Sequence, residues 1–239
     1  MMLLEIAGLR KSFGSVVAAE DLALSVAPGE ALGIIGPNGA GKTTLFNLLA
    51  GGLSADGGTI RLEGRDITRA PPQARCAAGI GRTHQIPLPF EKLTVFENLL
   101  VGAIHGRRRT ESEAAQACGE ILARLGLLAR ANHPAGSLTL LERKRLELAR
   151  ALATAPKLLL LDEIAGGLTE AECAELVATI KEIRDSGVAI VWIEHIVHAL
   201  LAVVQRLVVL SFGRKIAEGE PRAVMSSPEV HQIYMGIEA

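Results

Sequence analysis

The sequence predicts an α/β fold built around a parallel sheet. Two apolar runs, KLLLLDE at 157–163 and VAIVWIEH at 188–195, are separated by a helical pattern over 170–186. Apolar runs that alternate with helices are typical of buried parallel strands joined by crossover connections. With 239 residues, 49% hydrophobic and 21% charged, the chain is long and apolar enough to form one well-buried domain.

The remaining elements follow from local patterns. A helical pattern ends at Gly51-Gly52, because glycine is the usual residue after a helix. Residues 94–153 are mostly of helical period, which indicates a helical segment inserted midway. The predicted order is strands at 2–9 and 21–36, a helix at 43–50, a strand or hairpin arm at 58–67, helices within 94–153, the two apolar strands, a strand at 206–213 and a helix near the C-terminus.

The composition argues against several classes of protein. A net charge of −1 and an aromatic content of 3% argue against a nucleic-acid partner. No stretch approaches the about 18 apolar residues that span a bilayer, so work at a membrane is expected to go through a partner. The N-terminus lacks the pattern of a secretory signal. Three separated cysteines, in no CxxC or Cys/His cluster, indicate a reduced cytosolic protein: Cys76, Cys118 and Cys173.

A phosphate-binding loop is predicted between an apolar strand and the helix that follows it. GPNGAGKT fits the pattern G-x-x-x-x-G-K-[ST]. Its glycines let successive backbone N–H groups converge on phosphate oxygens at a helix N-terminus, whose dipole favours anions. Lys42 is expected to reach the β- and γ-phosphates, and the Thr43 hydroxyl to bind Mg²⁺. The predicted nucleotide-binding residues here are Gly36, Pro37, Asn38, Gly39, Ala40, Gly41, Lys42, Thr43 and Thr44.

Two acids and a histidine end the apolar strands. Asp162 and Glu163 end LLLLDE, and His195 ends the next run, so all three are expected at the carboxyl edge of the sheet, where such sheets bind ligands. Asp162 fits a Mg²⁺-side acid, Glu163 the residue that polarises the attacking water, and His195 a γ-phosphate contact. The alternative is a pair of strands that meet solvent at polar residues, with a packed or solvated histidine.

Together these motifs resemble the ATP-binding subunits of ABC transporters over essentially the whole chain. The match comprises GPNGAGKTT, a glutamine at Gln85, LLLLDE and IEH, in the family's order and approximate spacing. The resemblance implies a P-loop NTPase (RecA-like) core with a small antiparallel β-subdomain and an inserted helical subdomain. It implies one ABC-type ATP-binding domain at 1–239, with the helical subdomain at 92–153. ATP and Mg²⁺ are the implied cofactors.

Further segments look most like the ATPases of branched-chain amino acid importers, namely GIGRTHQ, LTVFENLLVGA and the ending SPEVHQIYMG. By that resemblance Gln85 contacts Mg²⁺ and nucleotide, and segment 86–100 lines the groove that receives a permease's cytoplasmic helix. Taken alone, that segment is a proline-punctuated loop entering a helix. Phe13 corresponds to the family's adenine-stacking aromatic; the alternative is an aromatic packed within the β-subdomain.

One stretch departs from the family. The usual loop Leu-Ser-Gly-Gly-Gln is replaced by LTLLE at 138–142. In the family this loop reaches the other subunit's γ-phosphate, so the resemblance makes Leu138 and Thr139 nucleotide contacts. A leucine obstructs the close approach that glycine permits, which predicts one weak half-site in a heterodimer; alternatively, Thr139 and the helix N-terminus suffice. The next basic residues are expected to form a solvated face: Arg143, Lys144, Arg145 and Arg150.

The sequence therefore predicts an ATPase subunit of an ABC importer, with Glu163, His195 and Lys42 as its catalytic residues. The expected partners are permease subunits and a second ATP-binding subunit, in a homodimer or heterodimer. Nucleic acid is not an expected partner, and membrane contact at the cytoplasmic face of the inner membrane goes through the permease. By resemblance the solute is a branched-chain amino acid or a related small polar solute. The alternatives are a soluble ABC ATPase acting on a macromolecular complex, and a nucleotide-binding regulatory module with weak catalysis.

Overall fold

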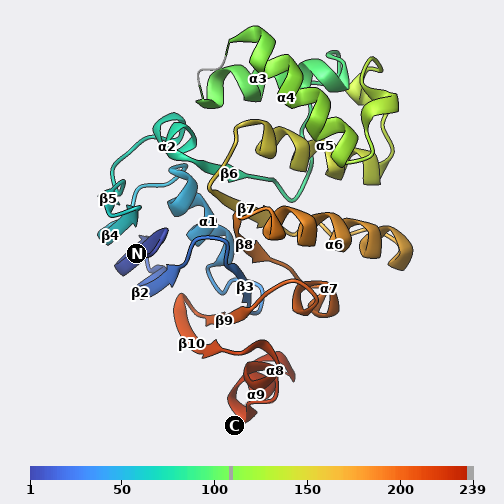
Figure 1. The fold of residues 1–239 in the computed structure, drawn as a ribbon. Helices are drawn as coiled ribbons and strands as arrows, with labels where there is room; N and C mark the ends of the chain where they lie inside the picture. Colours follow the sequence, from blue (N-terminus) through green and yellow to red (C-terminus); the bar gives the residue numbers. More distant parts are fainter. Residues whose placement is uncertain (108–109, 236–239) are drawn as a thin grey trace.

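A computed structural model describes residues 1–107 and 110–235, and within them it places a six-stranded sheet beside a smaller one (Figure 1). The strand order is β10-β9-β3-β8-β7-β6, in which β10 is antiparallel to β9 and the other pairs are parallel. The strands are β3 (Ala31–Ile35), β6 (Ile80–Arg82), β7 (Leu158–Asp162), β8 (Ala189–Ile193), β9 (Arg206–Ser211) and β10 (Arg214–Gly219). The predicted α/β class with a parallel centre is confirmed. Gly236, in the ending SPEVHQIYMG, lies outside the described residues.

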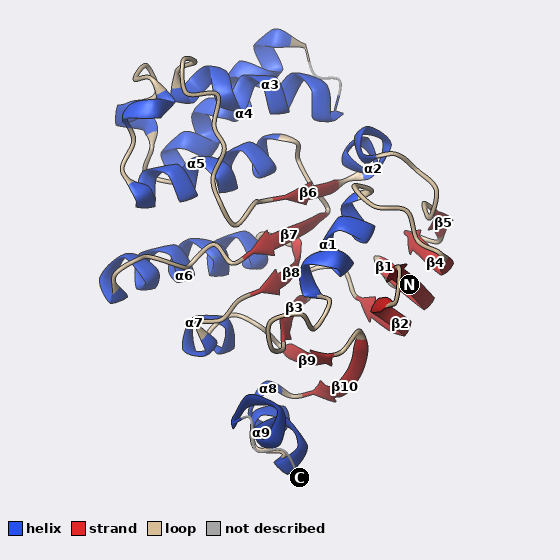
Figure 2. Ribbon diagram, turned by 180° about the vertical axis from the view of Figure 1, so that it is seen from behind, coloured by secondary structure: helices blue, strands red, loops and turns tan. Residues whose placement is uncertain are grey.

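The central strands β3, β7 and β8 of the larger sheet are buried on both faces, which explains why they read as continuous apolar runs. Along β7, Leu159 and Leu161 join one apolar cluster, while Leu158 and Leu160 join the other. Helix α6 (Glu170–Asp185) packs on the first face and α1 (Lys42–Ala50) on the second, as the two views show (Figures 1 and 2). These central strands are therefore covered on both faces, and their ends are the parts of them that can carry a site.

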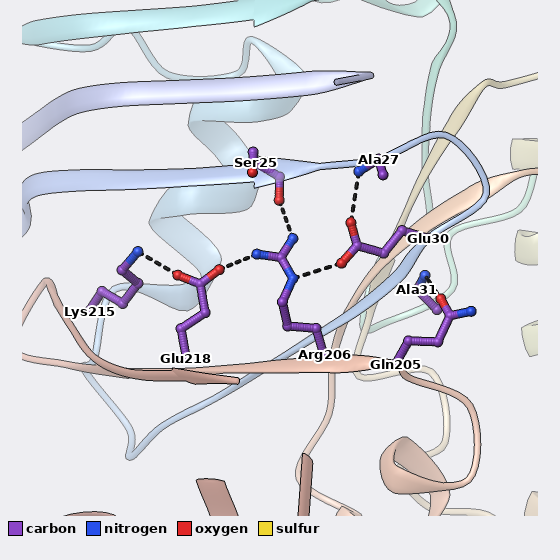
Figure 3. Close-up of polar contacts among 8 residues, drawn as sticks. All are labelled: Ser25, Ala27, Glu30, Ala31, Gln205, Arg206, Lys215 and Glu218. Atoms are coloured by element: carbon purple, nitrogen blue, oxygen red, sulfur yellow. Dashed lines mark hydrogen bonds and ion pairs between the residues drawn. The ribbon is translucent and has the colours of Figure 1, made fainter. Parts of the chain in front are cut away.

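The smaller sheet is antiparallel, in the order β2-β1-β4-β5. Its strands are β1 (Leu4–Phe13), β2 (Val16–Val26), β4 (Gly57–Leu62) and β5 (Arg65–Asp66). Arg206 ties it to the larger sheet, because its guanidinium donates to Glu30 at 2.7 Å, to Glu218 and to the Ser25 carbonyl (Figure 3). Gln205 Oε1 accepts from the Ala31 N–H at 2.9 Å, so this network fixes the start of β3.

Helices α3 (Val95–Arg107), α4 (Glu111–Arg124) and α5 (Leu140–Ala153) gather beyond edge strand β6, within the region predicted to be helical (Figure 1). Helices α4 and α5 each begin with a capping box, in which a threonine and a glutamate satisfy each other's backbone N–H groups. The remaining helices are α2 (Pro72–Ala78), α7 (Val197–Leu201), α8 (Pro221–Met225), α9 (Pro228–Met235) and the 3₁₀ turns Leu128–Arg130 and Ala135–Ser137. Strands β6 and β10 and helices α2 and α7 lie outside the predicted set. Within the described part of the chain, no helix combines the length and apolar character needed to cross a membrane.

Candidate nucleotide-binding site

Adjacent strands bring the predicted site residues to one edge of the larger sheet. The phosphate loop follows β3, His195 follows β8, Asp162 and Glu163 stand at the end of β7, and Gln85 follows β6. These four strands are neighbours in the order β3-β8-β7-β6 and run parallel, so their carboxyl ends meet. This edge is where open parallel sheets bind ligands.

The phosphate loop requires glycine for close approach. A Cβ on Gly36 would lie 2.1 Å from the Leu210 carbonyl oxygen, and one on Gly41 would lie 2.2 Å from the Ala18 carbonyl oxygen. Gly39, with φ of 80°, has no atom within 4 Å of the Cβ position, so its outer side is open. The loop is thus packed tightly against β2 and β9 and open towards a ligand.

Helix α1 begins directly after the loop and favours an anion there. Gly41 caps it without a side-chain hydrogen bond, and its first turn contains no acid. The N–H groups of that turn and the positive end of the helix dipole are therefore not neutralised by a side-chain carboxylate. Lys42 Nζ donates to the carbonyls of Gly36 at 2.7 Å and Pro37 at 2.9 Å. The pKa of Lys42 is lowered, because burial outweighs the opposing effect of the nearby charges of Glu163 and Asp162.

The Glu163 carboxylate is held between two side chains from neighbouring strand ends. Gln85 Nε2 donates to Oε2 at 2.5 Å, and His195 Nε2 lies 2.6 Å from Oε1. Glu163 has a φ of 45°, an uncommon and strained value for a residue with a side chain. It lines a pocket of about 350 Å³ together with Leu140, Lys144 and both of its partners. An acid fixed this way can orient a water molecule against a phosphate.

Asp162 has an unpredicted partner, Arg82. The guanidinium of Arg82 donates to Asp162 Oδ2 at 2.9 Å and to Asn47 Oδ1 at 2.6 Å. Thr83 Oγ1 accepts from the Asp162 N–H at 3.1 Å, so two successive residues of the β6 end hold Asp162. The available signal was a pair of polar residues, RT, directly before HQ in GIGRTHQ.

The predicted metal ligands fit Mg²⁺ in their chemistry. Thr43 supplies a hydroxyl, Asp162 a carboxylate and Gln85 an amide oxygen, and hard oxygen donors are what Mg²⁺ prefers, with phosphates completing the set. The Gln85 amide nitrogen is used on Glu163, which leaves the amide oxygen as an acceptor. Among the described residues, no group of three or more His, Cys, Asp or Glu side chains could hold a metal by itself.

Three predicted contacts lie away from this cluster. Phe13, at the β1–β2 turn, is 47% exposed, outside the apolar core of the smaller sheet, with Lys11 Nζ at 5.4 Å from its ring centroid. The Leu138 side chain is buried in the core, so a nucleotide contact by this residue would have to use its backbone. Thr139 is the exposed N-cap of α5 and accepts from the Glu142 N–H at 3.3 Å. Asn38 and Thr43 are exposed on the phosphate loop.

The prediction that the basic residues of α5 form a solvated face is wrong. Lys144 is 4% exposed, and its Nζ lies 3.5 Å from the Glu163 carbonyl oxygen. Arg143 donates to the carbonyls of Leu138 and Gly136, and the other two arginines pair with carboxylates, Arg145 with Glu175 and Arg150 with Glu147. Lys144 is buried because α5 packs against the loop after β7, and the arginines find partners before the helix, on α6 and within α5 itself.

Comparison with known proteins decides the family. The family described as ABC transporter matches residues 19–166, more than half of the chain. The chain belongs to the ABC transporter ATP-binding family. It is 37% identical to the high-affinity branched-chain amino acid transport ATP-binding protein LivG of Escherichia coli (strain K12), over 98% of each chain. It is 36% identical to BraF of Pseudomonas aeruginosa, which has the same description, again over 98% of each chain.

A solved structure agrees with this ABC assignment. An ATP-binding cassette of an ABC transporter, crystallised in its ADP conformation, superimposes with a TM-score of 0.91 at 34% identity, over 99% of each chain. The present chain is thus an ABC ATPase, and the sequence segments GPNGAGKT and LLLLDE meet at the edge of the sheet described above. Its altered loop at 138–142 is a feature of this ABC protein's own sequence.

Proposed function

We propose that this ABC ATPase hydrolyses ATP with Mg²⁺ to drive an importer of branched-chain amino acids or related small polar solutes. One observation carries the proposal of ATP hydrolysis. Gln85 and His195 hold the Glu163 carboxylate at the same sheet edge where the phosphate loop follows β3. The branched-chain amino acid transport function of LivG and BraF supports the solute class.

Each side chain has a role that its position suits. Glu163 polarises the attacking water, with its orientation fixed by two partners, and His195 contacts the γ-phosphate from the same side. Lys42 and the N–H groups of the loop neutralise phosphate charge, and Phe13 stacks on adenine. When bound, Mg²⁺ supplies further neutralisation of the phosphate oxygens.

A groove on the helical side suits a permease helix. It has a volume of about 480 Å³, and its lining includes Phe90, Val101 and Arg150. The loop before α3 is apolar and exposed, with Ile86 at 70% and Leu88 at 71%. We assign the groove to a cytoplasmic helix of a permease, which would bring the protein peripherally to the cytoplasmic face of the inner membrane. The chain is one ATP-binding domain over 1–239, and 92–153 forms the helical subdomain beside the groove.

A second ATP-binding subunit would complete each site. Thr139 and the backbone of Leu138 stand at the α5 N-terminus, which the family uses to contact nucleotide across the dimer. Both a homodimer and a heterodimer accommodate this arrangement, and the leucines at 140 and 141 make a weak half-site in the latter.

The experiment is ATP hydrolysis by the purified chain, alone and reconstituted with its permease. We expect saturable, Mg²⁺-dependent ATP binding that Lys42→Ala abolishes, and hydrolysis that rises when the permease and solute are present. Binding without hydrolysis in either setting would favour the regulatory module. Hydrolysis that the permease leaves unchanged, in an otherwise active chain, would favour a soluble ABC ATPase.

A further inference from the structure

Arg82 holds the metal-side acid by a forked contact. One terminal nitrogen of its guanidinium donates to Asp162 Oδ2 at 2.9 Å, and the other donates to Asn47 Oδ1 at 2.6 Å. The guanidinium carbon lies 5.9 Å from the ring centroid of Phe46. A planar guanidinium with two acceptors and an aromatic neighbour has one orientation, which a lysine ammonium cannot reproduce.

The pair that Arg82 makes is largely shielded from solvent. The side chains of Arg82 and Asp162 are 14% and 6% exposed, and Thr83 Oγ1 fixes the Asp162 backbone at 3.1 Å. Among the described residues, Arg82 takes Oδ2 of the carboxylate and no hydrogen bond reaches Oδ1. The contact thus divides the carboxylate, with one oxygen committed to the guanidinium and the other left for a ligand.

We propose that Arg82 is a positioning residue for Mg²⁺, which orients Asp162 so that Oδ1 serves the metal. The inference rests on the proposed function, since it needs Mg²⁺ and nucleotide at this edge. Removing one partner of a buried ion pair leaves the other charge without its compensating contact, and the carboxylate then rotates or draws in water. Partners that orient metal ligands typically change metal affinity about 10- to 100-fold.

The test is an equilibrium binding measurement on the full chain. The Kd for a fluorescent ATP analogue is measured with Mg²⁺ and again with EDTA, and the ratio of the two gives the advantage that Mg²⁺ confers. In Arg82→Met we expect this advantage to fall about tenfold or more, with the Kd in EDTA unchanged. In Arg82→Lys, which keeps the charge and loses the fork, we expect an intermediate loss. A Mg²⁺ advantage that stays the same or grows in Arg82→Met overturns the proposal.

Arg145→Met is the matched control. Arg145 also pairs with a carboxylate through a terminal nitrogen, Glu175 at 2.6 Å, and its side chain is 18% exposed. Its Nε, like that of Arg82, is buried without a partner among the described residues. We expect the Mg²⁺ advantage to be unchanged in this variant, and an equal loss in it would also overturn the proposal.

The outcomes separate this inference from the proposed function. If the parent chain gains nothing from Mg²⁺, the proposed function fails and this inference fails with it. If the parent shows the advantage and the Arg82 variants keep it, only this inference fails. Melting curves identify unfolded variants, and Arg82→Lys decides the matter if Arg82→Met does not fold.

Discussion

His195 Nε2 lies 2.6 Å from Glu163 Oε1, although the two residues follow different strands, β8 and β7. The contact arises because β7 and β8 are adjacent and parallel, so that residues after both strands emerge together. Gln85 takes the other oxygen of the same carboxylate at 2.5 Å. With a close polar contact at each oxygen, the Glu163 carboxylate has a defined direction before any substrate binds, which suits it to position a water molecule.

Replacing that acid should separate binding from turnover. Glu163→Gln keeps the size of the side chain and removes its charge, so we expect ATP to bind with Kd within a few-fold of the parent. Hydrolysis should fall about 100-fold or more, the typical contribution of a general base. Glu175→Gln, at a surface ion pair on α6, is the control and should hydrolyse ATP at the parental rate. Parental turnover in Glu163→Gln would show that another group serves as the base.

Two glycines of the phosphate loop should respond differently to alanine. Gly41→Ala places a Cβ 2.2 Å from a backbone oxygen and at a φ of 96°, so we expect unfolding free energy to drop by about 3 kcal/mol or more. Gly39→Ala meets no neighbour and has only the strain of its φ of 80°, so about 1 kcal/mol is expected. Urea unfolding of both variants checks this order, and equal losses would contradict it.

The strand ends that carry the acids could be predicted from the sequence for a physical reason. Strands buried on both faces are continuous apolar runs, and a polar residue that ends such a run must leave the sheet at its edge. Asp162, Glu163 and His195 are therefore placed by pattern alone. The phosphate loop is placed the same way, because its glycines stand between a strand and a helix.

Arg82 and Lys144 could not be placed in this way. Strand β6 spans only Ile80–Arg82, too short for a periodicity to show, and the acid that Arg82 holds is 80 residues away. Lys144 stands in a run of charges that resembles a solvated face, yet tertiary packing buries it beside Glu163. Both positions depend on contacts between distant segments, which a single sequence does not display.

The capping box at the start of α5 should give a pH signature. The Thr139 N–H, followed by the Arg130 side chain, lowers the pKa of Glu142 below its usual 4.5. The charged carboxylate therefore stabilises the fold fully above that value, and its contribution is lost as pH falls through the lowered pKa. In urea unfolding, the difference between the parent and Glu142→Gln should be constant above about pH 5.5 and shrink below it. A difference that stays constant down to about pH 3 would contradict this assignment.

The start of α5 also fixes where Leu140 and Leu141 of the altered loop at 138–142 lie. Helix α5 begins at Leu140, so both leucines occupy its first turn. Leu140 is 46% exposed and lines the Glu163 pocket, with its Cδ2 3.3 Å from the Cβ position of Gly167. Leu140 therefore contacts its own chain's loop after β7 and is still the more exposed of the two, because Leu141 is only partly exposed. Both leucines therefore stand at the helix start that a partner's phosphate would approach.

Leu141→Gly should raise ATP turnover in the assembled transporter if the leucine obstructs the phosphate. A glycine restores close backbone approach, and at this helical position it lowers unfolding free energy by about 1 kcal/mol. Leu141→Ala is the matched variant, because it shortens the side chain without freeing the backbone, so its gain should be smaller. ATP hydrolysis is measured with the natural second subunit and permease present. Unchanged turnover in both variants, in protein that still melts cooperatively, would mean that Thr139 and the helix N-terminus already suffice.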